Sequence, residues 1–355
     1  MSSKVYFIPL ARSDNLQIIN EELKELLDKS NLLDFIENND KCAVKVHFGE
    51  EGNTGFVRPE HLRVVCDEIR ARGGDAFLSD ANTLYRGKRL NSKDHLALAY
   101  EHGFTKEITA TDVIIPDDSK QENVISVQVN QKFIKQAKLA RIFIDSDAII
   151  AVSHFKGHIL TGFGGALKNI GMGCATREGK LAQHCDLAPV VQTERCIGCG
   201  ECVKICPAGA IHLEDKKSIL DSSKCIGCAS CLAVCPTMAM FIDFAAGVSV
   251  QEKMVEYSLA VLKEKKNKAG FINFAIKINK ECDCWGMENP QIAPDIGILA
   301  SMDPVSIDKA SFDLVNKTCG RDIFKETHPD QNGLMQLKTA QEIGLGNLDY
   351  ELIEL

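Results

Sequence analysis

Two stretches of the chain repeat each other: CIGCGECVKICPAGAI at residues 196–211 and CIGCASCLAVCPTMAM at residues 225–240. Each copy places its cysteines at the spacing C-x2-C-x2-C-x3-C-P, so eight of the 15 cysteines fall within these two short runs. The chain begins without an export signal, and clustered cysteines in such a chain favour metal binding over disulfide bonds. The repeat therefore indicates a duplicated metal-binding unit.

The spacing is that of bacterial ferredoxins, in which three cysteines of one run and the last cysteine of the other run bind one 4Fe-4S cluster. It predicts two clusters with crossed ligand sets. The first set is Cys196, Cys199, Cys202 and Cys235, and the second set is Cys225, Cys228, Cys231 and Cys206. Two zinc sites are the weaker interpretation, because zinc sites use ligand pairs with a longer gap. Two adjacent clusters favour one-electron transfer, with a purely structural role as the alternative.

Apolar β-rich runs alternate with amphipathic helical patterns on both sides of this repeat. The alternation predicts an α/β fold, with a mostly parallel sheet, helices on both faces and a small inserted α+β ferredoxin-like module. We assign residues 1–187 and 245–355 to the two parts of the α/β domain and residues 188–244 to the module. A separate C-terminal domain after residue 245 is the alternative.

The same patterns locate the individual elements. Strands are expected at residues 5–9, 42–47, 75–79, 124–127, 148–153, 271–278 and 296–299. Helices are expected at residues 16–29, 59–72, 94–102, 131–140, 251–265, 304–316 and 334–343. Pro59 and Pro304 stand at first-turn positions, where proline is favoured.

A glycine-rich segment, SHFKGHILTGFGGALKNIGMG at residues 153–173, follows one of the expected strands. Its glycines fit neither the P-loop nor the dinucleotide-binding motif, which argues against ATP and NAD. The amide groups of such a loop, together with Lys156 and Lys168, are suited to binding an anion. His154 and His158 add groups that move protons near neutral pH. A tight structural loop with a solvated lysine is the alternative.

Further polar residues follow other expected strands, and the carboxyl ends of parallel strands meet at one edge of a sheet. These residues are His47, Arg58, Asp80, Asn82, Tyr85 and Asp303. Taken singly, each fits a helix cap or a turn. Together they predict a ligand site at that edge.

Cys282, Asp283 and Cys284 form another motif. Cysteines this close in sequence make a strained disulfide, so free thiols or ligands of an additional metal ion are favoured. Partners for such a metal are available in Cys174, Cys185, His184 and His158. Two buried thiols in a turn are the alternative.

From residue 43 to residue 316 the chain resembles the uncharacterised iron-sulfur centre proteins, a domain of unknown function with an inserted ferredoxin module. The motifs that carry this resemblance are SHFKGH, TGFGGALKN, GMG, REGKLAQHC with Arg177, Lys180 and His184, the cysteine repeat, CDC and DIGILASMDPVSIDKA. The resemblance implies a 4Fe-4S protein of anaerobic bacteria or archaea. The α/β part also resembles the N-terminal domain of the nickel-pincer lactate racemase, which implies ligand contacts for His154, His158 and Lys168.

Composition narrows the function classes. The 355 residues carry a formal charge of -8, so a nucleic-acid partner is not expected. No apolar run is long enough for a membrane span, and no signal for export opens the chain, so a cytoplasmic protein without a membrane partner is expected.

We therefore expect an oxidoreductase that takes electrons from a redox partner protein and passes them through two clusters to a small anionic substrate or an additional metal ion. The catalytic candidates are His154, His158 and Lys168, and the substrate-binding candidates are Lys156, Arg177, Lys180 and His184. Cys282 and Cys284 hold the metal or react. A non-catalytic electron carrier or redox adaptor that docks on a partner enzyme is the alternative, and a sensor of oxygen or iron is a third interpretation.

Overall fold

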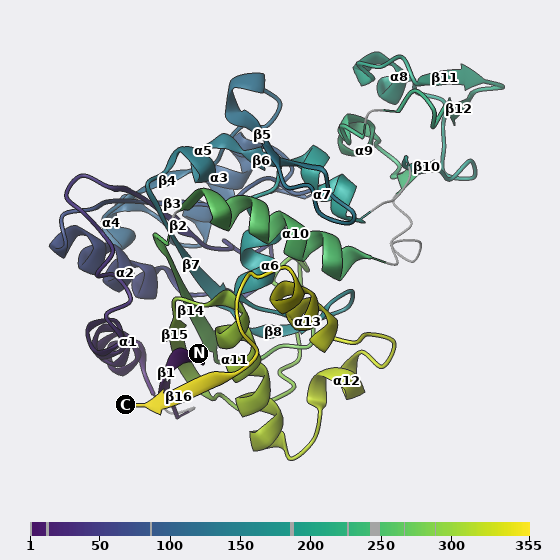
Figure 1. The fold of residues 1–355 in the computed structure, drawn as a ribbon. Helices are drawn as coiled ribbons and strands as arrows, with labels where there is room; N and C mark the ends of the chain where they lie inside the picture. The colour runs from purple at the N-terminus through teal and green to yellow at the C-terminus, as the bar shows by residue number, and fades with distance from the viewer. Residues whose placement is uncertain are drawn as a thin grey trace.

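The computed structural model describes residues 2–11, 14–85, 87–184, 188–225, 227–241, 249–265, 267–287 and 289–355. Its largest sheet contains β1 (Ser3–Pro9), β2 (Lys41–Lys45), β3 (Asp75–Ser79), β4 (Asp112–Ile114), β7 (Ala148–His154), β14 (Ala269–Ala275), β15 (Gly297–Ser301) and β16 (Tyr350–Glu354). The strand order is β16-β1-β15-β14-β7-β2-β3-β4 (Figure 1). Neighbouring strands are parallel except at β15, which is antiparallel to both β1 and β14. Strands from both sides of the cysteine repeat thus share one mostly parallel sheet, as predicted.

Helices cover both faces of the sheet, which also confirms the prediction. One face carries α1 (Leu16–Ser30), α2 (Pro59–Ala71) and α4 (Lys106–Thr109); the other carries α6 (Ala166–Gly171), α10 (Val250–Leu262), α11 (Pro304–Cys319) and α13 (Leu334–Glu342). Successive strand residues point to opposite faces. In β2, accordingly, Val44 packs in the core under α1 and α2, whereas Ala43 packs in the core under α6 and α10.

The remaining elements of the α/β body are short. They are α3 (Ser92–Glu101), α5 (Arg141–Asp145), α7 (Arg177–His184), α12 (Ile323–Thr327), two 3-10 turns at Gln121–Asn123 and Lys263–Lys265, and strands β5 (Val124–Gln128), β6 (Gln136–Ala140), β8 (Lys156–His158) and β9 (Gly162–Gly164). No helix in the described ranges is both long enough and apolar enough to cross a membrane.

One predicted element is wrong. Residues 131–140 do not form a helix, because residues 136–140 are strand β6, antiparallel to β5. Ala137 and Leu139 are fully buried while Gln136 is exposed and Lys138 only half-buried, which is the two-residue period of a strand. Pairing with β5 decides the conformation of this segment, and a local helix pattern does not reveal that pairing. The other six predicted helices and all seven predicted strands are present, with ends shifted by a few residues.

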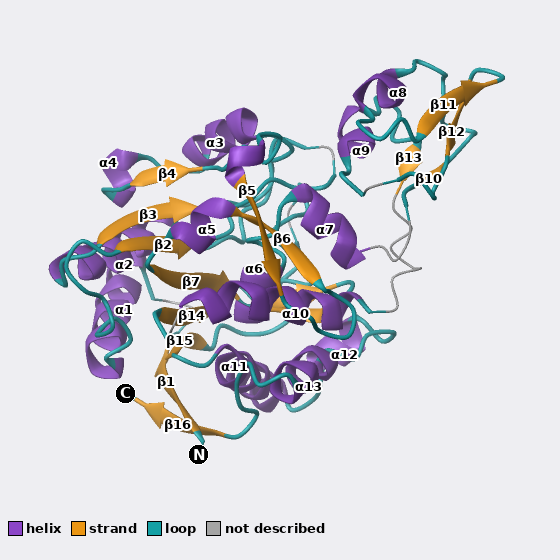
Figure 2. Ribbon diagram, turned by 45° about the horizontal axis from the view of Figure 1, so that its top comes forward, coloured by secondary structure: helices purple, strands orange, loops and turns teal. Residues whose placement is uncertain are grey.

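The cysteine repeat forms a small unit, here called the cysteine module, at residues 190–241 (Figure 2). It contains the paired strands β10 (Val190–Val191) and β13 (Met240–Phe241), the hairpin β11 (Ile211–Glu214) and β12 (Lys217–Leu220), and the short helices α8 (Glu201–Ile205) and α9 (Ser230–Val234). Both views place it beside α7 of the body. The predicted boundaries near residues 187 and 244 fall at residues outside the described ranges.

Apolar contacts join the module to the body. Ala229 and Leu232 of the module pack against Leu84 and Leu181, and Leu181 belongs to α7. The module's own buried core consists largely of cysteines, namely Cys196, Cys202, Cys231 and Cys235 with Ile211, Ala239 and Met240.

Candidate functional site

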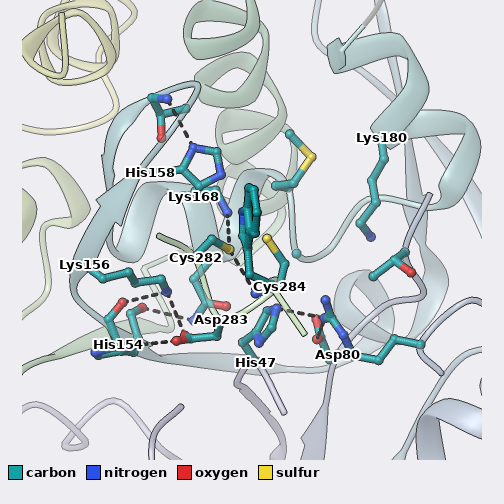
Figure 3. Close-up of a pocket in the computed structure, with 18 of the residues that line it drawn as sticks. His47, Asp80, His154, Lys156, His158, Lys168, Lys180, Cys282, Asp283 and Cys284 are labelled. Atoms are coloured by element: carbon teal, nitrogen blue, oxygen red, sulfur yellow. Dashed lines mark hydrogen bonds and ion pairs between the residues drawn. The ribbon is translucent and has the colours of Figure 1, made fainter. Parts of the chain in front are cut away.

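A cavity of about 550 Å³ opens at the carboxyl ends of β2, β3 and β7 and beside the loop that follows β14 (Figure 3). From β2 the chain runs to β3 and β4 on one side, and then returns to β7 and β14 on the other side. Ligand sites of open parallel sheets lie at such a reversal of strand order. The sheet therefore places the cavity where a binding site is expected.

Charged groups of both signs line the cavity, with cations in excess. The cationic lining residues are Lys45, Arg89, Lys156, Lys168 and Lys180, and the carboxylates are Asp80 and Asp283. His47, His158 and His184 also reach it. Because each carboxylate is already paired with a cation, the remaining cationic groups favour an anionic ligand.

Asp283 fixes the CDC motif to the sheet through two buried contacts. Its Oδ1 lies 2.9 Å from Nδ1 of His154, and its Oδ2 lies 3.1 Å from Nζ of Lys156. Burial raises the pKa of this carboxyl, but the charges of His154 and Lys156 outweigh burial and hold the pKa of Asp283 well below its usual range. The turn that carries both cysteines is thereby fixed to the end of β7.

His154 is occupied on both sides of its ring. Its Nδ1 faces the Asp283 carboxylate, and its Nε2 lies 3.0 Å from the carbonyl oxygen of Ile276. Both ring nitrogens thus face oxygen acceptors within the protein. This geometry favours a positioning role for His154; the predicted role in moving protons stays a prediction.

Cys282 is the most strongly perturbed thiol of the cavity. Its Sγ receives the Cys284 backbone N–H at 3.4 Å and lies 3.5 Å from Nζ of Lys168. A hydrogen bond from the Cys284 thiol, and then the charge of Lys168, hold the pKa of Cys282 well below its usual range against the effect of burial. The same hydrogen bond, together with burial, raises the pKa of Cys284. The two thiols thus interact, and the surroundings favour the ionised form at Cys282 and the protonated form at Cys284.

His158 and Lys168 complete the surroundings of Cys282. His158 Nδ1 accepts the backbone N–H of Leu160 at 3.1 Å and of Thr161 at 3.2 Å, which leaves the proton of the neutral ring on Nε2. The His158 side chain also hydrogen-bonds Cys282, while burial and Lys168 lower its pKa to about 4. Burial lowers the pKa of Lys168, but Cys282 and Cys284 outweigh burial and raise it. Figure 3 shows these side chains pointing toward one another.

The ends of β2 and β3 contribute a second charged group, in which the sequence reasoning found His47, Asp80 and Tyr85 but missed Lys45 and Arg89. Nζ of Lys45 lies 2.8 Å from Oδ1 of Asp80, and the fully buried Arg89 lies 2.8 Å from His47 and 2.6 Å from the Tyr85 hydroxyl. Burial raises the pKa of Asp80, but Lys45 and the neighbouring cations hold it well below its usual range. A lysine inside the apolar strand CAVKV was the available signal for Lys45.

The glycine-rich loop does not offer its helix N-terminus to an anion. The Asp308 carboxylate accepts the N–H groups of Ala166 and Leu167, at 2.7 and 3.0 Å. A Cβ at Gly165 would stand 2.2 Å from Asp308 Oδ1, so only glycine allows this approach. The N–H groups at the start of α6 are therefore not available to an anion, and the late DPVSIDKA motif serves to hold this loop.

The first predicted cluster set is gathered in the module. Cys196, Cys199, Cys202 and Cys235 line one small cavity. Burial raises the pKa of Cys196, but hydrogen bonds from the backbone N–H groups of Ser218 and Gly198 outweigh burial and lower the pKa. Burial likewise raises the pKa of Cys235, but hydrogen bonds from backbone N–H groups, including those of Met240 and Thr237, outweigh burial and lower it. Four gathered thiols, two of which receive backbone N–H groups at their sulfurs, suit a 4Fe-4S cluster.

The second predicted set is also close together. Burial, and then the charges of Cys228, Cys225, Cys202 and Cys206, raise the pKa of Cys231 to about 12. Bound iron would offset this burial and the neighbouring charges, because a coordinating thiol is deprotonated by its metal. Among the described residues, no three His, Cys, Asp or Glu side chains converge on a position for a single metal ion. A 4Fe-4S cluster does not require such a position, because each of its thiolate ligands binds a different iron atom.

Residues 42–313 match the family described as domain of unknown function DUF362. This chain belongs to the DUF362 family. No curated protein matches it.

Two solved structures resemble this DUF362 protein at low identity. The lactate racemase apoprotein from Thermoanaerobacterium thermosaccharolyticum has a TM-score of 0.41 and 15% identity, over 77% of this chain and 51% of that one. A protein from Thermotoga maritima has a TM-score of 0.42 and 12% identity, over 86% of this chain and 59% of that one. The chain thus spans about half to three-fifths of the length of these structures.

Most of the predicted site residues meet at the DUF362 cavity. The lining includes His154, His158, Lys168, Lys156, Lys180, His184, Cys282 and Cys284, together with His47, Asp80 and Tyr85. Arg177 does not line it: Arg177 pairs with Asp118 at 3.1 Å at the start of α7.

Other predicted residues lie elsewhere. Asn82 donates to the carbonyl of Pro116, Asp303 caps α11, and Arg58 precedes α2. Cys174 is fully buried away from the cavity lining, and Cys185 lies outside the described residues. An additional metal ion at Cys282 and Cys284 stays a prediction.

Proposed function

We propose that this protein is an iron-sulfur oxidoreductase, in which a redox partner protein supplies electrons to two 4Fe-4S clusters and the electrons reach a small anionic substrate in the cavity. Bound clusters would supply one-electron transfer, with the crossed cysteine sets as ligands. The gathering of Cys196, Cys199, Cys202 and Cys235 around one cavity supports the first set. The remaining chain binds, orients and protonates the substrate.

One observation carries the link between clusters and cavity. Ala229, which directly follows Cys228 of the second set, packs with Leu84 and Leu181. Leu84 is itself a lining residue of the cavity. The run that carries Cys225, Cys228 and Cys231 thus contacts the cavity wall through Ala229, whereas Ile197, which follows Cys196 of the first set, is 66% exposed. This arrangement supports entry of electrons at the first cluster and exit at the second.

The lining supports an anionic substrate. Lys168 stands beside Cys282, and Lys180 stands on the opposite part of the wall near Asp80 (Figure 3). Burial lowers the pKa of Lys180 to about 8, so this ammonium holds its charge near neutral pH but loses it in mild base. Lys156 pairs with Asp283 and donates to the His154 carbonyl, so its role is to hold the residues of the site in place.

A redox titration followed by electron paramagnetic resonance (EPR) tests this proposal. The probe is suberate, a dicarboxylate that cannot be reduced under these conditions. We expect two one-electron potentials, of which only one shifts when suberate fills the cavity. Bound suberate with both potentials unchanged would favour the alternative of a carrier that docks on a partner enzyme. Absence of any reducible cluster would contradict both.

A further inference from the structure

We propose that Cys282 and Cys284 form a redox-active dithiol that reduces a small anionic disulfide bound in the cavity. The inference rests on the proposed function, because the clusters would supply the electrons that regenerate the dithiol. It adds the substrate class and the residues that react.

A β-turn brings the two cysteines together. The Trp285 N–H donates to the Cys282 carbonyl at 3.0 Å, so Cys282 and Cys284 are the first and third residues of the turn. Asp283 between them is fixed by His154 and Lys156, and its carbonyl accepts the Glu50 N–H at 2.9 Å. Held this way, both cysteine side chains reach the cavity (Figure 3) and interact directly with each other.

The surroundings give the two sulfurs different roles. Cys282 receives three stabilising groups, from Lys168, the Cys284 N–H and His158, and so serves as the attacking thiolate. Cys284 stands beside Cys282 on the same turn, which is the position of a resolving thiol. A disulfide between residues this close is strained, and strained disulfides are readily reduced.

The reaction balances in two stages. The Cys282 thiolate attacks a disulfide RSSR, forms a mixed disulfide and releases RS⁻, which takes the proton of Cys284. The Cys284 thiolate then attacks Sγ of Cys282, breaks the mixed disulfide and releases a second RS⁻. Two electrons, one from each reduced cluster, and one proton return the Cys282–Cys284 disulfide to thiolate and thiol. A two-electron substrate thus matches two one-electron clusters.

The lining selects the charge of the disulfide. Lys168 and Lys180 are cations that line the cavity, and neither is paired within 4.0 Å with a carboxylate of the described residues. A volume of about 550 Å³ admits a molecule of small-metabolite size. An anionic disulfide would therefore place its carboxylates on the lysines and its sulfurs at Cys282.

A single-turnover experiment tests this reaction. Dithionite-reduced protein, freed of excess reductant under anaerobic conditions, is mixed with one equivalent of 3,3′-dithiodipropionate, and cluster oxidation and released thiol are measured. We expect about two thiols per protein as both clusters are oxidised, and at least a tenfold slower reaction with the neutral bis(2-hydroxyethyl) disulfide. The variants Cys282→Ser and Cys284→Ser should lose multiple turnover, while Cys319→Ser, outside the site, should match the wild-type protein.

A trapping experiment separates failure of this inference from failure of the proposed function. In Cys284→Ser the mixed disulfide cannot be resolved, so peptide mass spectrometry should find one mercaptopropionate unit on Cys282. Trapping in a protein without clusters would contradict the proposed function and retain the attacking role of Cys282. Reducible clusters that the disulfide oxidises equally fast in Cys282→Ser, with iron content and suberate binding unchanged, would overturn the dithiol and leave the proposed function standing.

Discussion

The cysteines of the module and those of the cavity are held in opposite ways. In the module, backbone N–H groups approach the sulfurs, and the cysteines themselves form much of a small core. In the cavity, Cys282 and Cys284 stand on a turn fixed by buried ion pairs at the edge of an eight-stranded sheet. If the module binds clusters as proposed, a unit with so little core would depend on them for its order, whereas the body would not.

Removal of one cluster ligand should have the largest effect on the protein, because it tests directly whether the module and the body differ in their dependence on metal. In Cys202→Ala the first cluster is lost, so iron content should fall by about half, and residues 190–241 should become sensitive to protease. The body should resist digestion. Iron analysis and proteolysis mapped by mass spectrometry measure both effects.

The matched control is Cys66→Ala, which removes a buried thiol from α2 of the body. It should leave the iron content unchanged. A Cys202→Ala protein with full iron content and a protease-resistant module would contradict the assigned ligand set.

A charge change beneath the CDC turn should affect the body instead. Asp283→Asn leaves His154 and Lys156 facing a neutral amide in a buried site, and loss of one partner from such a group costs about 3–5 kcal/mol. We expect a lower midpoint of thermal unfolding of the body, measured by circular dichroism. Asp112→Asn, which breaks an exposed pair with Lys106, should leave the midpoint almost unchanged, because solvent screens such a pair. Equal effects from both variants would mean that the turn is not held by its charges.

Ligand affinity should depend on pH through Lys180. Its lowered pKa of about 8 means that the ammonium is present below this pH and lost as pH rises through it. Suberate binding, measured by calorimetry, should weaken roughly fivefold between about pH 7 and pH 9, which corresponds to about 1 kcal/mol. Lys180→Met should bind more weakly at neutral pH and lack this step; a step of the same size in that variant would assign the titration to another group.

The smallest expected effect concerns a hydrogen bond to the first cysteine set. The Ser218 hydroxyl lies 3.1 Å from Cys202 Sγ. Hydrogen bonds to cluster sulfurs favour the reduced, more negative state, so Ser218→Ala should lower the potential of one cluster. A loss of about 0.5–1 kcal/mol corresponds to roughly 20–40 mV for one electron. A shift of both potentials, or of neither, would contradict the placement of Ser218 at one set only.

Local sequence patterns predicted much of the fold and part of the candidate site. The spacing of the cysteine repeat, the strand before His154 and the CDC motif are local, and strand ends meet by a general rule, so the cavity edge could be predicted. Arg89 and Asp308 were missed because their roles depend on partners distant in sequence, namely His47 and the start of α6. The helix expected at residues 131–140 failed for the same reason, since β5 decides its conformation.

The central claim is that the two cysteine sets hold two 4Fe-4S clusters next to a reactive cavity. Anaerobic analysis of iron and acid-labile sulfide, combined with EPR of the dithionite-reduced protein, tests it most directly. The account predicts about eight iron and about eight sulfide ions per chain, with spectra of two interacting clusters. Little iron with bound zinc in its place would contradict it.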